Sequence, residues 1–364
     1  MRISWVTNNP APYRLPVWDA LGSRAELDVL LLEDDSRFLR KTGNRGDDWV
    51  STPQTRYRMR HQPTWRLKRG ESDYYVSRAG WFSDSPDVVL LGGWESPAYF
   101  QALASAKRKR IPTVGFYESH LRSQGHAAGP IASARSSFFR RLDAVVTPGV
   151  AAAEALYEMG VPAEKVLVGF NAVDVDWIAR LAATARSREP AERAGHRYLF
   201  LGQLIERKNP LGLVRAFQSI AQQDDTLTIA GKGPLESQLR EIASTSVRMI
   251  GHTPYASIPN MLASHDTLVL PSHVEVWGLV ANEALAAGLN VVVTEGSGVA
   301  PSIKHMRGAY VVEDSIASLA AGMVLSRAEW SGPIASPEIL EHGPAEFASV
   351  FREAFDRVTA APSA

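Results

Sequence analysis

Residues 266–296 read DTLVLPSHVEVWGLVANEALAAGLNVVVTEG and contain the alternation that decides the fold. The outer runs, DTLVLPS and NVVVTEG, are apolar at consecutive positions, which is typical of parallel strands buried on both faces. The segment between them predicts a helix that begins after Gly278. A strand, a helix and a second strand in this order predict a β-α-β unit of a parallel sheet.

Two glutamates, Glu275 and Glu283, bracket seven residues without a charge. The predicted helix places Glu275 in the loop before it and Glu283 in its interior. The two carboxylates therefore belong to different elements and would meet a ligand from separate directions.

The same alternation continues on both sides of this stretch. Further buried parallel strands are predicted at RISWVT, LDVLLLE, DVVLLGG, IPTVGFY, LDAVVTPG, EKVLVGFN, RYLFLGQL, TLTIAGKG, VRMIGH and AYVVED. Helical spacing separates several of them, at RLPVWDALGS, SPAYFQALASAKRKR and GVAAAEALYEMG. The pattern predicts an α/β fold with doubly wound sheets.

The alternation lapses once, in the polar segment WIARLAATARSREPAERAGHR. We therefore predict two Rossmann-like domains, at residues 1–173 and 195–342, joined by a linker at 174–194 and facing each other across a cleft. Residues 343–364 include PAEFASVFREAFDRV, which is amphipathic in the helical period and is predicted to cross back onto the first domain.

Composition bounds the class of protein. The 364 residues include no cysteine, which excludes a disulfide framework, a thiolate nucleophile and a thiolate metal site. The N-terminal residues do not form a signal peptide's apolar region, and no apolar run approaches the roughly 20 residues that span a bilayer. We expect a cytoplasmic protein.

The formal net charge is zero, but residues 37–69 hold ten basic and two acidic residues, interleaved with Tyr57, Met59 and Trp65. Two interpretations stay open: a solvated basic loop, and contact with an anionic membrane surface at the inner face or with a phosphate-bearing acceptor. Nucleic acid is disfavoured because a neutral chain lacks the long-range field that drives such binding.

Two strand-to-helix loops of the second half have the chemistry of a phosphate site. Lys208 follows the strand YLFLG, and the glycine-rich turn KGPLESQ follows LTIAG. Ligands of open α/β sheets bind at the carboxyl ends of the strands, and amides at helix starts together with a lysine attract phosphate.

Read in order, the segments FLGQLIERKNPLGLVRAF, LTIAGKGPLESQL and residues 247–298 resemble the donor-binding domain of retaining family 4 glycosyltransferases with the GT-B fold. The resemblance is close over residues 198–300 and looser in the first half. It implies that residues 1–173 form the acceptor-binding domain and residues 195–342 the donor-binding domain. It implies transfer of a hexose-type sugar from a nucleoside diphosphate sugar, with uridine diphosphate favoured, to a carbohydrate, lipid-linked or small-molecule hydroxyl acceptor. It implies no metal and no further cofactor.

In that family the first glutamate lies at the hexose and the second holds the ribose hydroxyls, so Glu275 and Glu283 inherit these roles by position. A carboxylate suits a polyol because it accepts two hydroxyl hydrogen bonds, each strengthened by its charge. The other implied donor-binding residues are Arg14, Gln203, Gly231, Gly233, Ile250, Trp277, Gly278 and Leu279, with Lys208 and His120 added to Glu275 as catalytic residues.

The chain departs from the family pattern at two loops. Gln203 stands where relatives have an arginine that binds the diphosphate. Two alternatives stay open for Arg207: it compensates for the missing charge, or its side chain points elsewhere because the loop keeps its register. The first loop, NNPAPYR, replaces a glycine pair and leaves Arg14 to face the phosphate. His120 follows a predicted strand where relatives keep a histidine near the donor sugar, with Tyr117 and Glu118 as weaker neighbours.

The implied chemistry is retaining transfer in which the leaving diphosphate deprotonates the acceptor on the same face. Two other classes of protein are alternatives. A nicotinamide oxidoreductase lacks support because no G-x-G-x-x-G follows the first strand. A GT-B protein that binds a nucleotide sugar without transferring it, or a phosphorylase or epimerase, stays open. The Asp174–Asp176 motif DVD is interpreted as an ordinary turn and not as a metal site.

Overall fold

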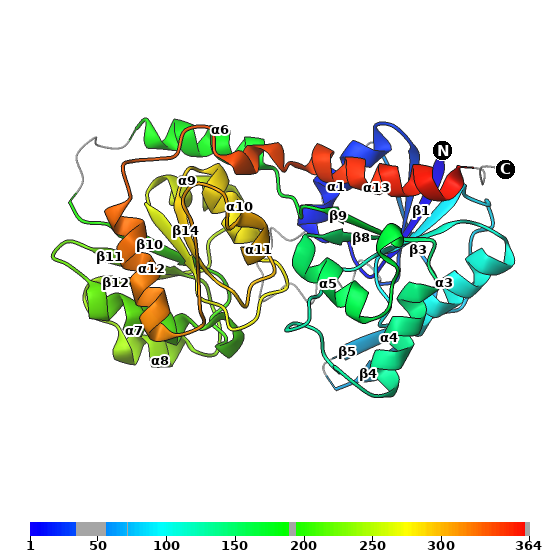
Figure 1. The fold of residues 1–364 in the computed structure, drawn as a ribbon, viewed down its shortest axis with the longest axis horizontal. Helices are drawn as coiled ribbons and strands as arrows, with labels where there is room; N and C mark the ends of the chain where they lie inside the picture. The colour runs from blue at the N-terminus through cyan, green and yellow to red at the C-terminus, as the bar shows by residue number, and fades with distance from the viewer. Residues whose placement is uncertain (34–55, 71, 189–193, 361–364) are drawn as a thin grey trace. The chain divides into compact units, whose positions relative to one another are not determined.

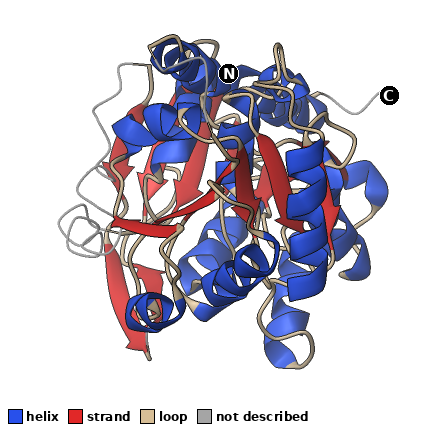
Figure 2. Ribbon diagram, turned by 90° about the vertical axis from the view of Figure 1, so that its left-hand side faces the viewer, coloured by secondary structure: helices blue, strands red, loops and turns tan. Residues whose placement is uncertain are grey.

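The computed structural model describes residues 1–33, 56–70, 72–188 and 194–360 (Figure 1). The chain divides into two compact units, which are described separately. Unit 1 comprises Met1–Asn171 and Pro344–Ala364, and unit 2 comprises Ala172–Gly343. In Figure 2 the strands lie between layers of helices, as in doubly wound α/β folds.

Unit 1 contains a parallel sheet of seven strands in the order β3-β2-β1-β6-β7-β8-β9. The order reverses between β1 and β6, and at such a switch point the loops after two neighbouring strands diverge and open a crevice. The sheet strands are β1 (Arg2–Thr7), β2 (Glu26–Leu31), β3 (Arg58–His61), β6 (Val88–Leu91), β7 (Thr113–Phe116), β8 (Ala144–Pro148) and β9 (Val166–Gly169).

The helices of unit 1 are α1 (Leu15–Gly22), α3 (Pro97–Arg108), α4 (Pro130–Arg140), α5 (Val150–Glu158) and α13 (Pro344–Thr359). Helix α13 comes from the end of the chain and packs against α1 and strands β6 to β9. Its Phe351 lies 4.9 Å from the ring of Trp5 and 5.3 Å from that of Phe116, measured between ring centres. The C-terminal segment is therefore part of the core of unit 1.

The basic stretch contains strands that the sequence pattern did not predict. Its residues 37–55 lie outside the described part of the chain, but β3 forms the edge of the sheet and β4 (Thr64–Arg69) pairs with β5 (Ser72–Ser77) in an antiparallel hairpin. The residues in these strands do not form a loop, but most of those in β3 and β4 are exposed, as the interpretation of a solvated segment expects. The apolar pattern missed these strands because they contain charged residues. An edge strand and an exposed hairpin do not need apolar faces.

Unit 2 contains a parallel sheet of six strands in the order β12-β11-β10-β13-β14-β15, with its switch point between β10 and β13. Its strands are β10 (Arg197–Leu201), β11 (Thr226–Ala230), β12 (Val247–Gly251), β13 (Thr267–Leu270), β14 (Asn290–Thr294) and β15 (Ala309–Val312). Its helices are α6 (Val175–Arg186), α7 (Pro210–Ile220), α8 (Glu236–Ile242), α9 (Ile258–Ala263), α10 (Leu279–Ala286), α11 (Ala300–Ile303) and α12 (Ile316–Ala328).

The segment predicted as a linker contains α6, which packs against α9 and α10 of unit 2. Asp174 caps this helix, because its carboxylate accepts a hydrogen bond of 3.0 Å from the Trp177 amide. The first aspartate of the DVD motif thus has a local structural partner. None of the helices in the described ranges combines the length and apolar character of a bilayer-spanning segment.

Candidate active site

The candidate site of unit 2 is built from the loops at the carboxyl ends of β10, β11 and β13. After β10, residues Glu206–Lys208 form a 3₁₀ turn, and Asn209 adopts a left-handed conformation with φ of 50°. The Asn209 side chain then accepts a hydrogen bond of 3.1 Å from Gly212 and caps α7. This turn fixes Lys208 in the loop at the switch point.

Backbone packing between two loops explains the glycines of the KGP turn. A Cβ atom on Gly231 would lie 1.8 Å from the Gly202 carbonyl oxygen, and one on Gly233 would lie 2.4 Å from the Leu204 carbonyl oxygen. The Leu204 amide in turn donates a hydrogen bond of 3.0 Å to the Lys232 carbonyl. Only glycine allows this approach, so the packing of the two loops alone requires glycine at both positions.

The loop after β13 presents Glu275. Its amide donates to the Gly296 carbonyl at 3.1 Å, and its carbonyl accepts from the Gly298 amide at 2.9 Å. The Glu275 carboxylate forms an ion pair with the Lys208 ammonium group, and both side chains are largely buried. The structure therefore joins two of the three predicted catalytic side chains in one contact.

Arg207 lies beside Glu275. Its guanidinium is 3.7 Å from the Glu275 carboxylate and donates a hydrogen bond of 3.2 Å to the Val274 carbonyl. Whether it replaces the family's arginine toward a diphosphate stays a prediction. Arg207 adds positive charge at the loop where Gln203, which is exposed, replaces the family's arginine.

Helix α10 begins directly beyond this loop. Gly278 has a φ of 104°, which favours glycine, and no side chain caps the first turn that starts at Leu279. Its first amides are therefore donors without a capping side chain. The Trp277 side chain is buried, and its indole donates a hydrogen bond of 3.1 Å to Asn282. The Trp277 side chain thus fixes the loop, and its donor-binding role stays a prediction.

Glu283 lies inside α10 and is 6% exposed. Burial raises the pKa of its carboxyl group to about 8. Burial, together with the charges of Glu283 and Asp174, raises the pKa of Tyr255. The Tyr255 ring stacks on Trp177 at 5.4 Å between ring centres. These two aromatic residues near Glu283 were not predicted from the sequence, because they come from other elements, α6 and the loop after β12.

Ile250 is half exposed near the end of β12, where an apolar surface can contact a flat ring. The carbonyl of the neighbouring Gly251 accepts a hydrogen bond of 2.7 Å from Gly231. The predicted donor-binding residues of unit 2 therefore lie at or beyond the carboxyl ends of four adjacent parallel strands, in the loops, at the end of β12 and in α10.

Unit 1 has a cavity of about 220 Å³ at the carboxyl ends of β1, β6 and β7. Arg14 lines it, but its guanidinium forms an ion pair with Glu118 and donates a hydrogen bond of 3.2 Å to Thr7. Although burial opposes its charge, Glu118 raises the pKa of Arg14, which stays protonated. Arg14 thus lies in the cavity beside Glu118, and its role toward a phosphate stays a prediction.

Asn8 and Glu95 line the same cavity and were not predicted. The Tyr99 hydroxyl donates to the Asn8 side-chain oxygen at 3.0 Å, which turns the Asn8 amide nitrogen toward Glu95 at 2.6 Å. His120 lies in the loop after β7 and is 5% exposed, and its backbone amide donates to the Ser123 hydroxyl at 2.8 Å. The neighbouring Ser119 lines the cavity.

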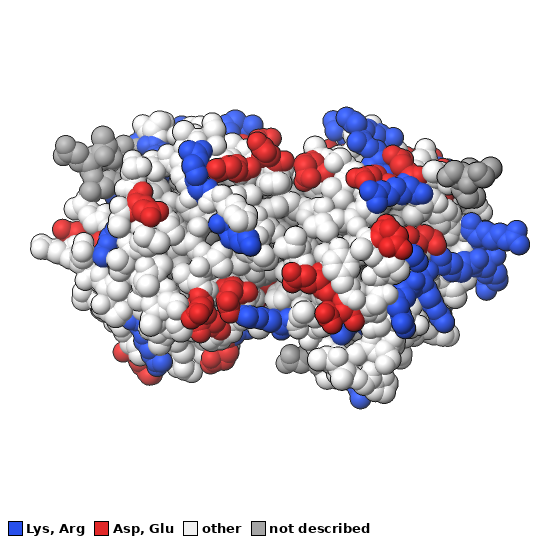
Figure 3. All heavy atoms as spheres, in the orientation of Figure 1, with Lys and Arg blue, Asp and Glu red and all other residues white. Residues whose placement is uncertain are grey.

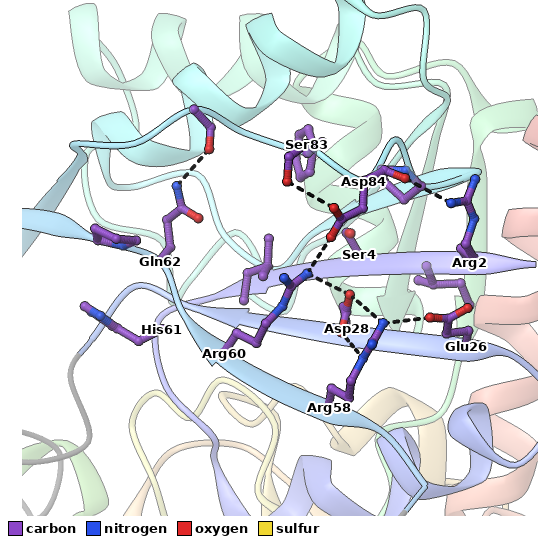
Figure 4. A pocket seen from close by; sticks show the side chains of 16 residues that line it. Arg2, Ser4, Glu26, Asp28, Arg58, Arg60, His61, Gln62, Ser83 and Asp84 are labelled. Atoms are coloured by element: carbon purple, nitrogen blue, oxygen red, sulfur yellow. Dashed lines mark hydrogen bonds and ion pairs between the residues drawn. The ribbon is translucent and has the colours of Figure 1, made fainter.

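A second pocket of unit 1, of about 410 Å³, lies on the sheet face beside β1, β2 and β3. Figure 4 shows its charged side chains paired with one another: Arg58 with Glu26 and Asp28, and Arg60 with Asp28 and Asp84. This network stabilises the edge of the sheet. It does not lie at the strand ends where ligands of such folds bind.

Comparison with known proteins identifies the class. The family described as "Glycosyl transferase 4-like domain" matches residues 11–171, and the family described as "Glycosyl transferases group 1" matches residues 184–325. Among solved structures, Anabaena HepE in complex with UDP superposes with a TM-score of 0.68 at 15% identity, over 99% of this chain and 96% of that one. Two Rossmann-like sheets and these matches define a GT-B fold.

Curated relatives share parts of this chain. Glycogen synthase of Mycobacterium tuberculosis is 28% identical over 65% of this chain and 59% of its own length. The GDP-mannose-dependent alpha-mannosyltransferase of the same species is 29% identical over 58% of this chain and 56% of its own length. The match thus spans less than two thirds of these relatives. The chain belongs to the GT-B glycosyltransferases of family 4.

The raised pKa of Glu283 predicts a pH dependence of stability. The folded chain retains a proton between pH 4.5 and about 8 that the unfolded chain has lost, so stability falls as pH rises through this window. The side chain of Glu283→Gln cannot ionise, so the free energy of unfolding of this variant should fall less over the same window. Above pH 8 the losses of the wild type and the variant should differ by roughly 3 to 5 kcal/mol.

Urea denaturation of both proteins at pH 5 and pH 9 measures this difference. Glu241→Gln, which changes an exposed glutamate of the same unit, is the matched control. Equal pH slopes for the wild type and Glu283→Gln would show that Glu283 is already ionised at neutral pH.

Proposed function

We propose that the protein is a retaining, metal-independent hexosyltransferase that moves a sugar from a nucleoside diphosphate sugar to a hydroxyl acceptor of a glycan, glycolipid or natural product. The observation that carries the proposal is the ion pair of Lys208 and Glu275 at the switch point of unit 2. In this proposal Lys208 is the cation that binds phosphate and Glu275 is the anion that binds sugar hydroxyls, and both lie inside the segment that matches the group 1 family.

The donor would bind across the loops of unit 2. Its diphosphate would contact Lys208 and the first amides of α10, whose start carries partial positive charge. Glu275 would accept hydrogen bonds from the hexose, and Glu283 from the ribose, whose hydroxyl donors favour the ionised carboxylate. Gln203 would supply a neutral donor to the phosphate.

Transfer would proceed on one face of the sugar. The bond between the anomeric carbon and the diphosphate oxygen breaks, the acceptor oxygen bonds to the same carbon, and the acceptor proton passes to the leaving diphosphate. Charge grows on that diphosphate, and Lys208 together with the α10 amides would stabilise it. The configuration at the anomeric carbon is retained. His120 would act near the donor sugar.

Uridine diphosphate is the favoured leaving group, in keeping with the UDP complex of the fold relative. The name of the mannosyltransferase relative specifies GDP instead. A transfer assay with uridine, guanosine and adenosine diphosphate sugars separates these choices. Donor hydrolysis without any transfer to a panel of hydroxyl acceptors would point to another reaction on the same fold.

Replacing Lys208 tests the proposed phosphate site. Lys208→Ala should lower kcat/KM by roughly 10²- to 10³-fold, because it removes one preorganised charge from the leaving diphosphate. Lys304→Ala removes an exposed lysine of the same unit and should leave the rate unchanged. Steady-state kinetics with the preferred donor measure both, and full activity of Lys208→Ala would exclude the lysine from the mechanism.

Substitutions of the two glutamates should have different effects on kinetics and on nucleotide affinity. Ribose geometry barely changes during transfer, so Glu283→Gln should weaken donor and free nucleoside diphosphate about equally and act mainly on KM. The hexose gains positive charge in the transition state, so Glu275→Gln should lower kcat and leave nucleoside diphosphate affinity nearly intact. Calorimetric titration at pH 8.5, beside kinetics, tests the assignment. Similar losses of nucleotide affinity in both variants would contradict it.

We further propose that the described part of the basic stretch contacts an anionic membrane at its inner face. Trp65 is 60% and Leu67 53% exposed, and the register pairs them with Val76 and Tyr74 on one face of the hairpin β4-β5. Arg78 lies 5.8 Å from the centre of the Trp65 ring. Figure 3 shows further Lys and Arg side chains gathered over α3, the helix against which β5 packs.

Vesicle binding tests this surface. Binding should be stronger to vesicles that contain phosphatidylserine than to phosphatidylcholine alone, and it should weaken with salt. Trp65→Ser with Leu67→Ser should lower it at least about tenfold, since two apolar side chains no longer enter the lipid. Tyr157→Ser, at another exposed aromatic residue of unit 1, is the control. Binding independent of both salt and lipid charge would overturn the proposal.

A further inference from the structure

We infer that a cavity between helices α1 and α13 of unit 1 binds a small anion that also carries hydroxyl groups, that is, a phosphorylated or carboxylated polyol. It is called the α1–α13 cavity below. The proposed function places the donor in unit 2, and the inference does not depend on that function. Neither the family matches nor the names of the relatives assign a ligand to this cavity.

The α1–α13 cavity lies at the amino ends of the strands of unit 1 and has a volume of about 480 Å³. Ile3 lines it near the start of β1, and Ala25 lines it directly before β2. The two helices on either side of it pack against each other (Figure 1). Because ligands of open α/β sheets bind at the carboxyl ends of the strands, this cavity lies at the opposite edge from the usual site of the fold.

The lining combines apolar and polar side chains. Leu21 and Phe355 are buried and supply apolar surface. On α13, Glu346, Ser349 and Arg352 follow one another at the i, i+3 spacing, so they lie along one side of the helix. Apolar surface with a few placed polar groups is typical of sites that hold small molecules.

Two arginines of the lining carry charges that have no counterion in the described part of the chain. Arg24 is exposed in the turn after α1, and Arg352 is partly exposed on α13. Neither guanidinium takes part in a hydrogen bond or an ion pair with another described residue. In the pocket of Figure 4, by contrast, Arg58 and Arg60 both pair with a carboxylate. The two guanidinium groups of the α1–α13 cavity are therefore available to a phosphate or carboxylate, which arginine binds through two parallel hydrogen bonds.

The acidic side chains of the lining do not supply that anion. Glu346 and Asp356 line the cavity, but neither forms an ion pair within the described ranges. One carboxyl oxygen of Glu346, Oε2, is buried without a hydrogen-bond partner among the described residues, and burial raises the pKa of this carboxyl group. Buried polar atoms are usually hydrogen-bonded, so this oxygen favours a ligand that brings a polar group. A hydroxyl suits it in either protonation state, because a hydroxyl both donates and accepts hydrogen bonds.

Ser349 adds a second group for ligand hydroxyls. Its own hydroxyl donates a hydrogen bond of 2.6 Å to the Glu346 carbonyl, which fixes its direction and leaves its oxygen as an acceptor. Ser349 lies between Glu346 and Arg352 along α13. We therefore assign Arg24 and Arg352 to the anionic group of the ligand, and Glu346 and Ser349 to its hydroxyl groups.

Calorimetric titration of the full chain, without donor or acceptor, tests the inference. Glucose 6-phosphate and gluconate combine an anion with hydroxyl groups, whereas glucose lacks the anion and inorganic phosphate lacks the polyol. At least one of the first two probes should bind about tenfold or more tightly than both glucose and inorganic phosphate, because each part of the ligand adds hydrogen bonds to charged groups. The tighter of the two identifies the anionic group as a phosphate or a carboxylate.

Single substitutions separate the two parts of the site. Arg24→Gln and Arg352→Gln should each weaken the tighter probe about tenfold, since a charge-assisted contact is lost. Glu346→Ala should weaken the same probe about fivefold without weakening inorganic phosphate, because it removes only a partner of the hydroxyl groups. Arg141→Gln, at another exposed arginine of unit 1, is the matched control and should bind like the wild type. Thermal unfolding without ligand verifies that each variant is folded, and the exposed Arg24 provides a change that leaves the core intact.

Repeating the titration with Lys208→Ala separates this cavity from the proposed donor site, because that variant should bind the probe as tightly as the wild type. The inference is overturned if none of the probes binds, if both arginine variants bind like the wild type, or if Lys208→Ala abolishes binding. Transfer kinetics test the proposed function separately, so each idea can fail without the other.

Discussion

Parallel pairing of every strand in the two large sheets is the constraint on which the sites depend. It gathers the carboxyl ends of all strands in a sheet at one edge, so residues far apart in sequence follow neighbouring strands. Lys208 and Glu275 are 67 residues apart and form an ion pair. Arg14 and Glu118 are 104 residues apart and do the same in unit 1. The strand order brings both pairs together.

Close backbone approach is the second requirement of the site in unit 2. The loop after β10 touches the loop after β11 at Gly231 and Gly233, so neither position can carry a side chain. The loop of Glu275 is tied to residues 296–298 by two backbone hydrogen bonds. The loops thus hold one another in place, and a charged side chain at their surface has a defined position before any ligand binds.

The sequence predicted the regular parts of this structure and missed the irregular ones. All twelve strands predicted from apolar runs are present in the two large sheets, although β12 and β15 are only partly buried. Strands β3 and β4 were missed because arginines and a lysine interrupt their sequences, RMRH and TWRLKR, and β5 was missed because its sequence, SDYYVS, is only partly apolar. The roles of Lys208, Glu275 and Glu283 stay predictions, although the structure pairs the first two. Asn8 and Glu95 could not be found, since only the fold brings a loop after β1 beside the start of α3.

The two ion pairs show how a site can keep a buried cation without a ligand. Removing one partner of such a pair leaves a buried charge at a cost of about 3 to 5 kcal/mol, so each cation needs an anion at all times. In the proposed function the diphosphate supplies that anion to Lys208 and frees Glu275 for the hexose. Arg14 of unit 1 is held by Glu118 in the same way. Each pair therefore keeps a cation at the carboxyl ends of a parallel sheet, where an incoming anion could take the place of the carboxylate.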